Sequence, residues 1–278
     1  MRILLNSVFV ILLFLTNYSL AQENSDEYSK DRFSASLGGF YTGLNNSVIV
    51  GIDQLGIGLS LELEDALGLE SSAFVLRGDA TYSFGKKRNK RLSIGYIGLL
   101  RKSEITLDRK LEVGDVVFPL ETKISTKFNL EIYELSYNWG FFQDERMRIG
   151  LGGGLFVMPI GFSIAANENE SDFLQFTAPL PALEVSTEFY ITPKLTYTQT
   201  LNLFYIRFGT FEGALTDLNL NLEYRAFDHF AFGAGLNSFK LNLEAKEELF
   251  WEFDFKGSVR SSYFGALFYA KYLIKYKE

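Results

Sequence analysis

The stretch from Ala214 to Ala226 alternates between apolar and polar side chains with a period of two. Its apolar parity carries Ala214, Leu218, Leu220, Leu222, Tyr224 and Ala226. Its polar parity carries Asp217, Asn219, Asn221, Glu223 and Arg225. Successive side chains of a strand point to opposite faces, so this alternation predicts a β-strand with one apolar and one charged face. A half-buried soluble sheet alternates in the same way, so the number and connection of such strands must decide what kind of sheet this is.

Similar strands recur along the chain and predict ten in all. They cover roughly 33–50, 73–84, 91–101, 122–140, 147–164, 173–191, 195–208, 214–226, 230–243 and 258–276. Within 122–140 the apolar parity shifts between Ile132 and Leu135, which predicts a β-bulge near Tyr133. Counts of eight or twelve strands stay open, because residues 55–63 and 251–255 also alternate. We favour strand extensions or a loop sheet for those two stretches.

The connections alternate between short and long, and the short ones share one end of the sheet. Short turns, longer loops at the opposite end and an even strand number are typical of bacterial outer-membrane barrels. Every backbone polar group in lipid must be paired within the protein. Strands that cross a membrane therefore have to close into a barrel, which leaves no unpaired edge. The fold expected is therefore all-β, an antiparallel up-and-down transmembrane β-barrel of about ten strands. A secreted soluble β-barrel or sandwich that binds a hydrophobic ligand is the alternative.

Aromatic side chains stand on the apolar parity a few residues before several of the short turns. Such positions are typical of the aromatic girdle at a membrane interface. The interface aromatics expected from the sequence are Tyr82, Tyr137, Trp139, Phe189, Tyr224, Tyr272 and Tyr276.

The start of the chain predicts export. A basic Met1-Arg2 precedes an apolar run that ends in the small residues Ser19 and Ala21, which is typical of a cleaved secretory signal peptide; a signal anchor is the rival interpretation. The expected organisation is a signal peptide over 1–21, a polar segment over 22–32 and the barrel domain over 33–278. The formal net charge of −7 makes nucleic acid a poor partner. The absence of cysteine excludes disulfides and a lipid-modified N-terminal cysteine.

Three features together give the chain a resemblance to a known group. They are the signal peptide, the segment LRGDATYSF (residues 76–84) before a basic turn, and the aromatic final strand SSYFGALFYAKYLIKY (residues 261–276). The chain resembles the small, porin-like outer-membrane barrel proteins of Gram-negative bacteria, in the broad OmpA/OmpW-like group. The resemblance implies a place in the outer membrane of the cell envelope, with outer-membrane lipid and the barrel-assembly machinery as partners. The chain departs from that pattern at its end, where Lys277 and Glu278 follow Tyr276.

The residue types argue against catalysis. Outer-membrane phospholipases, lipid A deacylases and omptin-type proteases resemble one another in needing a histidine near the outer rim. The chain has one histidine, His229, and the sequence places it in a short turn at the opposite end. We therefore expect no catalytic residue and no cofactor, and no metal site built on histidine or cysteine.

Two motifs have structural rather than functional interpretations. The glycine run at Gly150–Gly154 lies inside a strand, so it favours sharp coiling or the close approach of filling side chains over nucleotide binding. The segment LELEDALGL (residues 61–69) is expected to form a solvated loop sheet; the alternative is a cap over the barrel mouth or a ligand contact. Its acidic residues, Glu62, Glu64 and Asp65, could attract cations.

Charged residues also occur on the inward parity of several strands. They are Arg77, Asp79, Glu184, Glu188, Asp217, Glu223, Arg225 and Lys271. Ten strands enclose little more room than eight, so a mutually paired network that fills the interior is favoured over a pore lining or a ligand-contacting cluster. The function expected is that of a non-enzymatic structural or surface-interaction barrel. A narrow channel or small-solute transporter is the alternative, with a small solute or an extracellular partner at the long loops left open.

Overall fold

The computed structural model describes residues 31–50, 59–85, 88–113, 116–166, 169–209, 211–245 and 257–275. The expected signal peptide, most of the polar segment after it and Tyr276 lie outside these residues. So does the stretch 251–255 that raised the twelve-strand alternative. Within the described residues, no helix is both long and apolar enough to cross a membrane.

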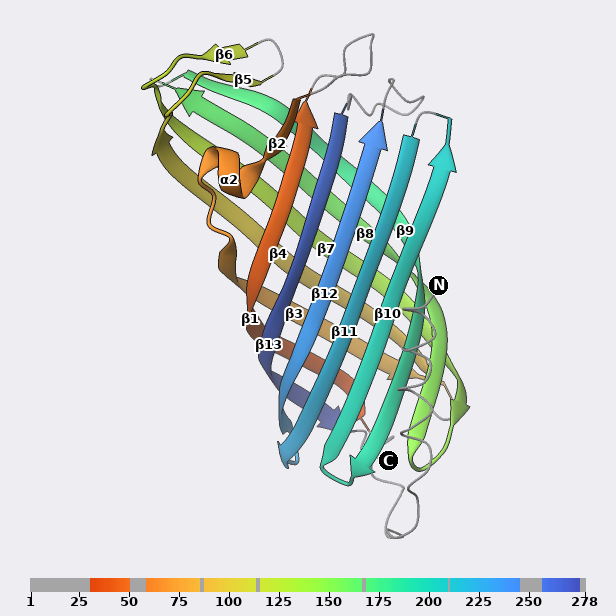
Figure 1. Cartoon of the computed structure of the whole chain (residues 1–278). Helices are drawn as coiled ribbons and strands as arrows, with labels where there is room; N and C mark the ends of the chain where they lie inside the picture. Colours follow the sequence, from red (N-terminus) through yellow and green to blue (C-terminus); the bar gives the residue numbers. More distant parts are fainter. Residues whose placement is uncertain are drawn as a thin grey trace, which may run out of the picture.

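Ten long strands of the described chain close into an antiparallel barrel, as predicted (Figure 1). Each strand pairs with the next along the chain, and the first pairs with the last. The barrel strands are β1 (Asp31–Val50), β3 (Ser72–Phe84), β4 (Lys90–Thr106), β7 (Lys123–Gln143), β8 (Met147–Ala166), β9 (Asn169–Thr192), β10 (Leu195–Phe208), β11 (Phe211–Phe227), β12 (Phe230–Ala245) and β13 (Gly257–Lys275).

Four short elements lie at one end of the barrel, called the loop end (Figure 1). They are β2 (Leu59–Glu62), α2 (Leu63–Leu67) and the hairpin of β5 (Leu111–Val113) and β6 (Val116–Phe118). The other end, called the turn end, holds the short connections after β3, β7, β9 and β11. β2 pairs with the last residues of β1, so it extends the sheet rather than adding a span.

Several strand boundaries lie beyond those expected from the sequence, including those of β1 and of the β8–β9 pair. β1 begins at Asp31, two residues inside the expected polar segment. β8 and β9 pair as far as Ala166 with Asn169, so most of the loop expected over 165–172 is strand. Both extensions add backbone hydrogen bonds at positions where the side-chain pattern carries no alternation to reveal them.

The bulge expected near Tyr133 is absent. β4 pairs with β7 in one unbroken register from Lys90–Trp139 to Thr106–Lys123. The irregularity on β7 lies instead between Gly140 and Phe142, where it pairs with β8. The parity of β7 stays constant, and what changes along it is the polarity of the two sides of the wall.

That change in polarity divides the barrel into two layers. In the turn-end half the outer face is apolar and the inner face polar, as on β12, where Phe232 and Ala234 face out. In the loop-end half the relation is inverted: Phe239 and Leu241 face in, while Lys240 faces out. The buried interior of this half, called the apolar layer, includes Phe40, Val48, Phe128, Leu130, Phe156, Met158, Ile160, Phe162, Phe239, Leu241, Val259 and Tyr263.

The apolar layer is possible because the wall separates into two sheets towards the loop end. β9 and β10 are paired only up to Leu183 and Leu203, and β3 and β4 only up to Leu76 and Gly98. Beyond these points β4, β7, β8 and β9 form one sheet, and β10 to β13 with β1 and β2 form the other. Apolar inner faces then pack together as in a sandwich, while the outer faces meet water.

The segment over 61–69 does not form the solvated loop sheet expected from its sequence. It forms α2 and its flanks, which fill the gap beside β4 where β3 is missing. Leu63, Leu67 and Leu69 are buried in the apolar layer. Glu64 pairs with Arg101 at 2.7 Å and also binds Asn46, so it is already neutralised by the protein. Alternation in a short segment does not distinguish a strand from one turn of a buried helix.

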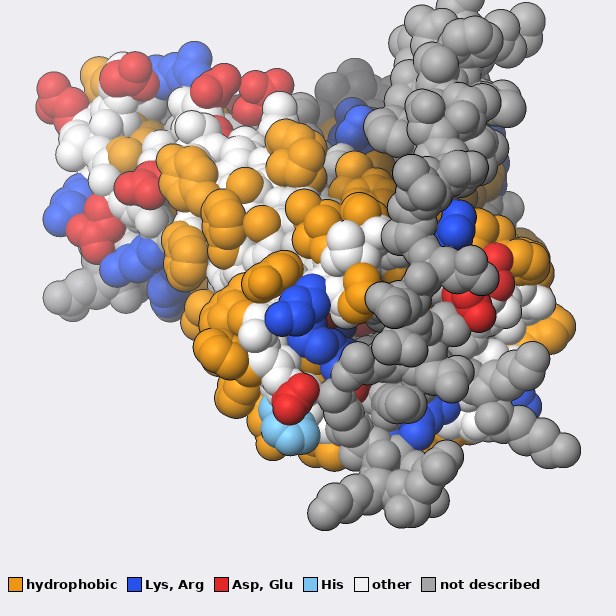
Figure 2. Space-filling view, turned by 90° about the horizontal axis from the view of Figure 1, so that it is seen from below, with side chains coloured by type: hydrophobic (Ala, Val, Ile, Leu, Met, Phe, Trp, Pro, Cys, Tyr) orange, Lys and Arg blue, Asp and Glu red, His pale blue; other side chains and the backbone are white. Residues whose placement is uncertain are grey.

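Figure 2 shows the molecule from the turn end, with hydrophobic side chains over much of the wall and charged ones gathered on the part that protrudes behind. Exposed apolar residues of the turn-end half include Leu37, Phe74, Leu76, Ile94, Leu135, Leu151, Leu183, Phe232 and Phe268. Such a band is large for a surface in water, but it is the surface that lipid requires.

Candidate functional site

The polar interior of the turn-end half encloses a cavity of ≈ 280 Å³, called the vestibule. Its lining reaches the turns at Arg88, Pro193 and Lys194. Towards the loop end it stops at the apolar layer. The vestibule is therefore a polar pocket that reaches the turn end of the barrel.

The structure places all eight charged residues of the sequence analysis on the inner face. Seven of them line the vestibule: Arg77, Asp79, Glu184, Glu188, Glu223, Arg225 and Lys271. Asp217 lies deeper, where it lines a water-sized space of ≈ 10 Å³ with Arg77, Glu134 and Tyr263. The turn-end interior is thus not completely filled.

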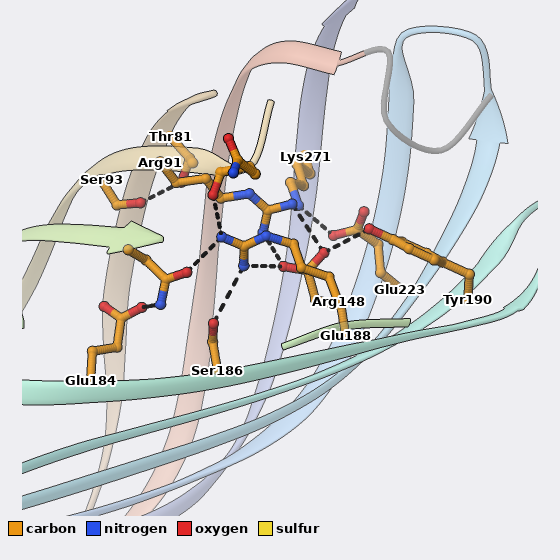
Figure 3. A network of polar contacts seen from close by, with 12 residues as sticks. Thr81, Arg91, Ser93, Arg148, Glu184, Ser186, Glu188, Tyr190, Glu223 and Lys271 are labelled. Carbon is orange, nitrogen blue, oxygen red and sulfur yellow. Dashed lines mark hydrogen bonds and ion pairs between the residues drawn. The ribbon is translucent and has the colours of Figure 1, made fainter. Parts of the chain in front are cut away.

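One ion-pair network is centred on Glu188 of β9. Arg91 donates both terminal guanidinium nitrogens to its carboxylate, and Arg148 lies 3.5 Å from the same group. Figure 3 shows the two guanidinium groups side by side. Arg148 is almost fully buried and also donates to Asn138 at 2.6 Å, while Asn138 donates to Glu184 at 2.7 Å. Because two cations share one buried carboxylate, Glu188 is the residue on which this network depends.

Further pairs connect strands that are distant in sequence. Arg77 binds Asp79 at 3.0 Å and donates to Asn219 of β11 at 2.7 Å. Lys271 of β13 pairs with Glu223 of β11 at 2.9 Å. Arg225 pairs with Asp31, the first residue of β1. These contacts tie the strands across the interior, as expected for charges held out of bulk water.

The sequence analysis missed Arg91, Arg148 and Glu134. Arg148 lies between the apolar residues Met147 and Ile149. The alternation along its strand could therefore have identified it as an inward-facing charge. Arg91 directly follows the basic turn, at the first position of the expected strand 91–101, and was not counted among the inward charges. Glu134 precedes the outward Leu135, so the alternation after the expected bulge could have identified it.

The described aromatics expected at the membrane interface all lie on the outer face near the turn end. Tyr82, Tyr137, Trp139, Tyr224 and Tyr272 are exposed there, and Phe189 is half-buried. A second set of outward aromatics, which the sequence analysis did not identify, borders the apolar band towards the loop end: Tyr41, Tyr96, Tyr133 and Tyr205. Tyr197 and Tyr205 on β10 span eight residues, or about 26 Å along the strand. On β10 this separation matches the height of the apolar band of a membrane barrel.

The vestibule offers charged groups together with hydrogen-bond donors and acceptors. His229 lies in the turn between β11 and β12, where its Nδ1 is 3.0 Å from the Leu273 carbonyl oxygen. The described residues contain no group of three or more His, Cys, Asp or Glu side chains placed to hold a metal ion.

No protein-family model and no curated protein matches the chain. Among solved structures, it is similar to the outer membrane protease OmpT of Escherichia coli, with a TM-score of 0.52 and 8% identity over 90% of this chain and 100% of that one. The toluene transporter TbuX of Ralstonia pickettii has a TM-score of 0.37 and 9% identity, over 89% and 91% of the two chains. The attachment invasion locus protein Ail of Yersinia pestis has a TM-score of 0.31 and 10% identity, over 86% of this chain and 99% of that one. At 8% identity the likeness to OmpT concerns the fold alone, the closed antiparallel barrel of an outer-membrane protein.

Proposed function

We propose that the chain is exported by a signal peptide cleaved after Ala21 and inserts into the outer membrane as a non-conducting, non-enzymatic barrel. The turn end then faces the periplasm, and the two-sheet part with α2 and the β5–β6 hairpin stands outside the lipid. Support comes from the apolar band between two aromatic girdles and from the polar outer face beyond it. The role proposed is structural, or the display of the protruding part to a partner outside the cell.

The apolar layer is the observation that carries this proposal. Phe128, Phe156, Phe239 and Tyr263 belong to one buried cluster inside the barrel, and each is less than a tenth exposed. Water and ions would have to pass this buried apolar cluster, and protein interiors are close-packed. A barrel of this kind serves as a scaffold and surface rather than as a pore.

Planar bilayer recording tests the proposal. The refolded chain from Gln22 to Glu278 is expected to insert without single-channel steps, whereas steady steps of one size would contradict a closed interior. A porin refolded and recorded in the same way controls for insertion. Monodisperse behaviour in buffer without detergent, with native strand content, would contradict the membrane location itself.

The vestibule favours a second candidate, a narrow channel or small-solute transporter. In that case the apolar layer would have to rearrange, and α2 is one part of it that is not held in a barrel strand. Solute flux into liposomes carrying the protein, without current steps, would favour this candidate over the closed scaffold.

No catalytic role is proposed, because the fold shared with OmpT does not bring a histidine to the loop end of this chain. Loss of a lipid- or peptide-cleaving activity on His229→Ala substitution would contradict that view.

A further inference from the structure

The deep end of the vestibule, called the floor, carries more negative than positive charge. Arg77, Asp79 and Glu134 line both the vestibule and the water-sized space next to it, and Asp217 lines that space. One guanidinium group therefore faces three carboxylates. Arg77 is bound by Asp79 at 3.0 Å, and Glu134 has no ion pair of its own with any described residue. Because buried charges are normally paired, the floor lacks a positive charge.

The floor also holds hydrogen-bonding atoms that have no partner. The Tyr263 hydroxyl lines the water-sized space and is unpartnered, and only 4% of the residue is exposed. Asn202 and Asn237 each donate an amide N–H to Asp217, and their Oδ1 oxygens are buried without a donor. Native proteins rarely leave buried polar atoms unpaired, so three such atoms in one place indicate that a donor is missing.

A glycine leaves room for that donor. Gly95 of β4 pairs with Asp79 of β3 on one side and with Glu134 of β7 on the other, so the three residues share one row of the wall. A Cβ built on Gly95 would lie 3.1 Å from Asp79 Oδ1 and 3.6 Å from Glu134 Oε2. The two carboxylates therefore lean over the glycine from both sides. The space of ≈ 10 Å³ that Gly95 also lines is about the size of one water molecule.

We propose that the floor binds the ammonium group of a small primary amine, whose other atoms lie in the vestibule. An ammonium group is similar in size to a water molecule, carries a positive charge and has three N–H donors and no acceptor. Asp79, Glu134 and the Tyr263 hydroxyl accept these three hydrogen bonds. Water would bring two donors and no charge, so it matches the floor less well.

The rest of the vestibule narrows the class of amine. Outside the floor, the lining holds six cations and four carboxylates, so a second ammonium group on the ligand would be repelled. The wall there also presents hydroxyl groups, among them Thr196, Thr198 and Thr200 of β10. The ligand expected is therefore a polar monoamine such as an amino alcohol. The site lies inside the closed barrel and does not depend on the orientation or the lack of conductance proposed above.

Equilibrium dialysis with radiolabelled ethanolamine tests the site. The refolded barrel, in a non-ionic detergent and an amine-free buffer, is expected to bind it saturably at one site per chain. Choline has the same charge but no N–H donor, and ethylene glycol has a similar shape but no charge. Both are expected to compete about ten-fold or more weakly than unlabelled ethanolamine, because charge-assisted hydrogen bonds are lost. Lack of saturable binding, or equal competition by choline, NaCl or MgCl₂, would overturn the assignment.

Three substitutions locate the site. Glu134→Gln removes a carboxylate that has no ion pair, and Gly95→Ala places a methyl group between the two carboxylates. Both are expected to weaken ethanolamine binding about ten-fold or more. Tyr263→Phe removes the unpartnered hydroxyl and is expected to weaken it about three-fold or more. Asp31→Asn, at a vestibule carboxylate that pairs with Arg225, is the matched control and is expected to bind like the parent chain.

Folding is checked in the same samples. Equal mobility of the folded band on an unheated gel shows that each variant has formed the barrel. Ethanolamine is also expected to raise the denaturant midpoint of the parent chain and of Asp31→Asn but not of Glu134→Gln, because a ligand of the folded state stabilises it. If the folded floor variants bind ethanolamine as tightly as the parent chain, or if Asp31→Asn loses binding to the same extent, the proposal is wrong.

Discussion

Leu236 faces outward from β12 with 44% of its surface exposed, whereas Phe239, three positions nearer the loop end, faces inward and is 1% exposed. Between these two residues the polarity of the wall inverts. Below them the outer face is apolar, and above them it carries Lys240 and Asn242. The same inversion separates Phe264 from Tyr263 on the adjacent β13. It marks the level at which the barrel leaves an apolar surrounding and begins to behave like a water-soluble sandwich.

A charged residue introduced on the outer face of β12 should therefore lower the free energy of unfolding by an amount that depends on its position along the strand. Ala234→Arg lies within the apolar band and is expected to lower the free energy of unfolding by about 2–4 kcal/mol, the range for a cation near the bilayer midplane. Asn242→Arg, on the same face but above the inversion, is expected to stay within about 0.5 kcal/mol of the parent chain. Denaturant titrations of both variants in lipid vesicles measure the difference. Equal costs would mean that the lipid boundary is misplaced.

The apolar layer should behave as a protein core. Phe128 is fully buried in it, so Phe128→Ala is expected to cost about 3–5 kcal/mol, through lost burial and the cavity left behind. Phe268→Ala removes the same side chain from the outer face of the apolar band, where lipid can close around the smaller residue. It is expected to cost less than half as much. The same titrations in vesicles compare the two, and a larger cost at Phe268 would argue against a packed layer.

The strand count, the closure and the inward parity of the charged residues could be predicted from the sequence, because a period of two is visible in each strand by itself. The inversion of polarity between the two faces of the wall could not be predicted in the same way. On β7 the move of apolar residues from Phe128 and Ile132 to Leu135 and Tyr137 has two explanations, a bulge or a change of surroundings, and a single strand does not distinguish them. Only the unbroken register with β4 decides between them.

The side-chain contacts inside the barrel were harder to predict from the sequence, for a related reason. Parity shows that Arg148 and Glu188 face inward, but not that they meet, since that depends on the stagger of β8 against β9 and on the barrel radius. The burial of α2 depends in the same way on the early end of β3, which no local pattern in residues 61–69 reveals.

Glu188 should be the most sensitive residue of the vestibule. Glu188→Gln keeps the shape of the side chain but leaves Arg91 and Arg148 facing each other without a carboxylate, and it is expected to cost about 3–5 kcal/mol. Adding Arg148→Met to this variant removes one of the two uncompensated cations and is expected to recover a large part of the loss. Glu212→Gln, at an exposed pair with Arg207, is the matched control and is expected to leave stability unchanged. If the double variant were less stable than Glu188→Gln alone, the two arginines would not be competing for one carboxylate.

The glycine run of β8 offers a comparison of two substitutions within one strand. A Cβ built on Gly152 would lie 2.1 Å from the Tyr137 carbonyl oxygen of β7, whereas a Cβ on Gly161 would meet nothing within 4 Å. Gly152→Ala must therefore push β7 and β8 apart at the vestibule wall, and a loss of about 1–3 kcal/mol is expected from overpacking. Gly161→Ala is expected to be neutral or to stabilise by about 0.4–1 kcal/mol, because alanine restricts the unfolded chain. Hydrogen exchange at the amides of Tyr137 and Asn138 should rise only in the first variant. If Gly152→Ala were as stable as Gly161→Ala, the close approach of these two strands would not be the reason for glycine at this position.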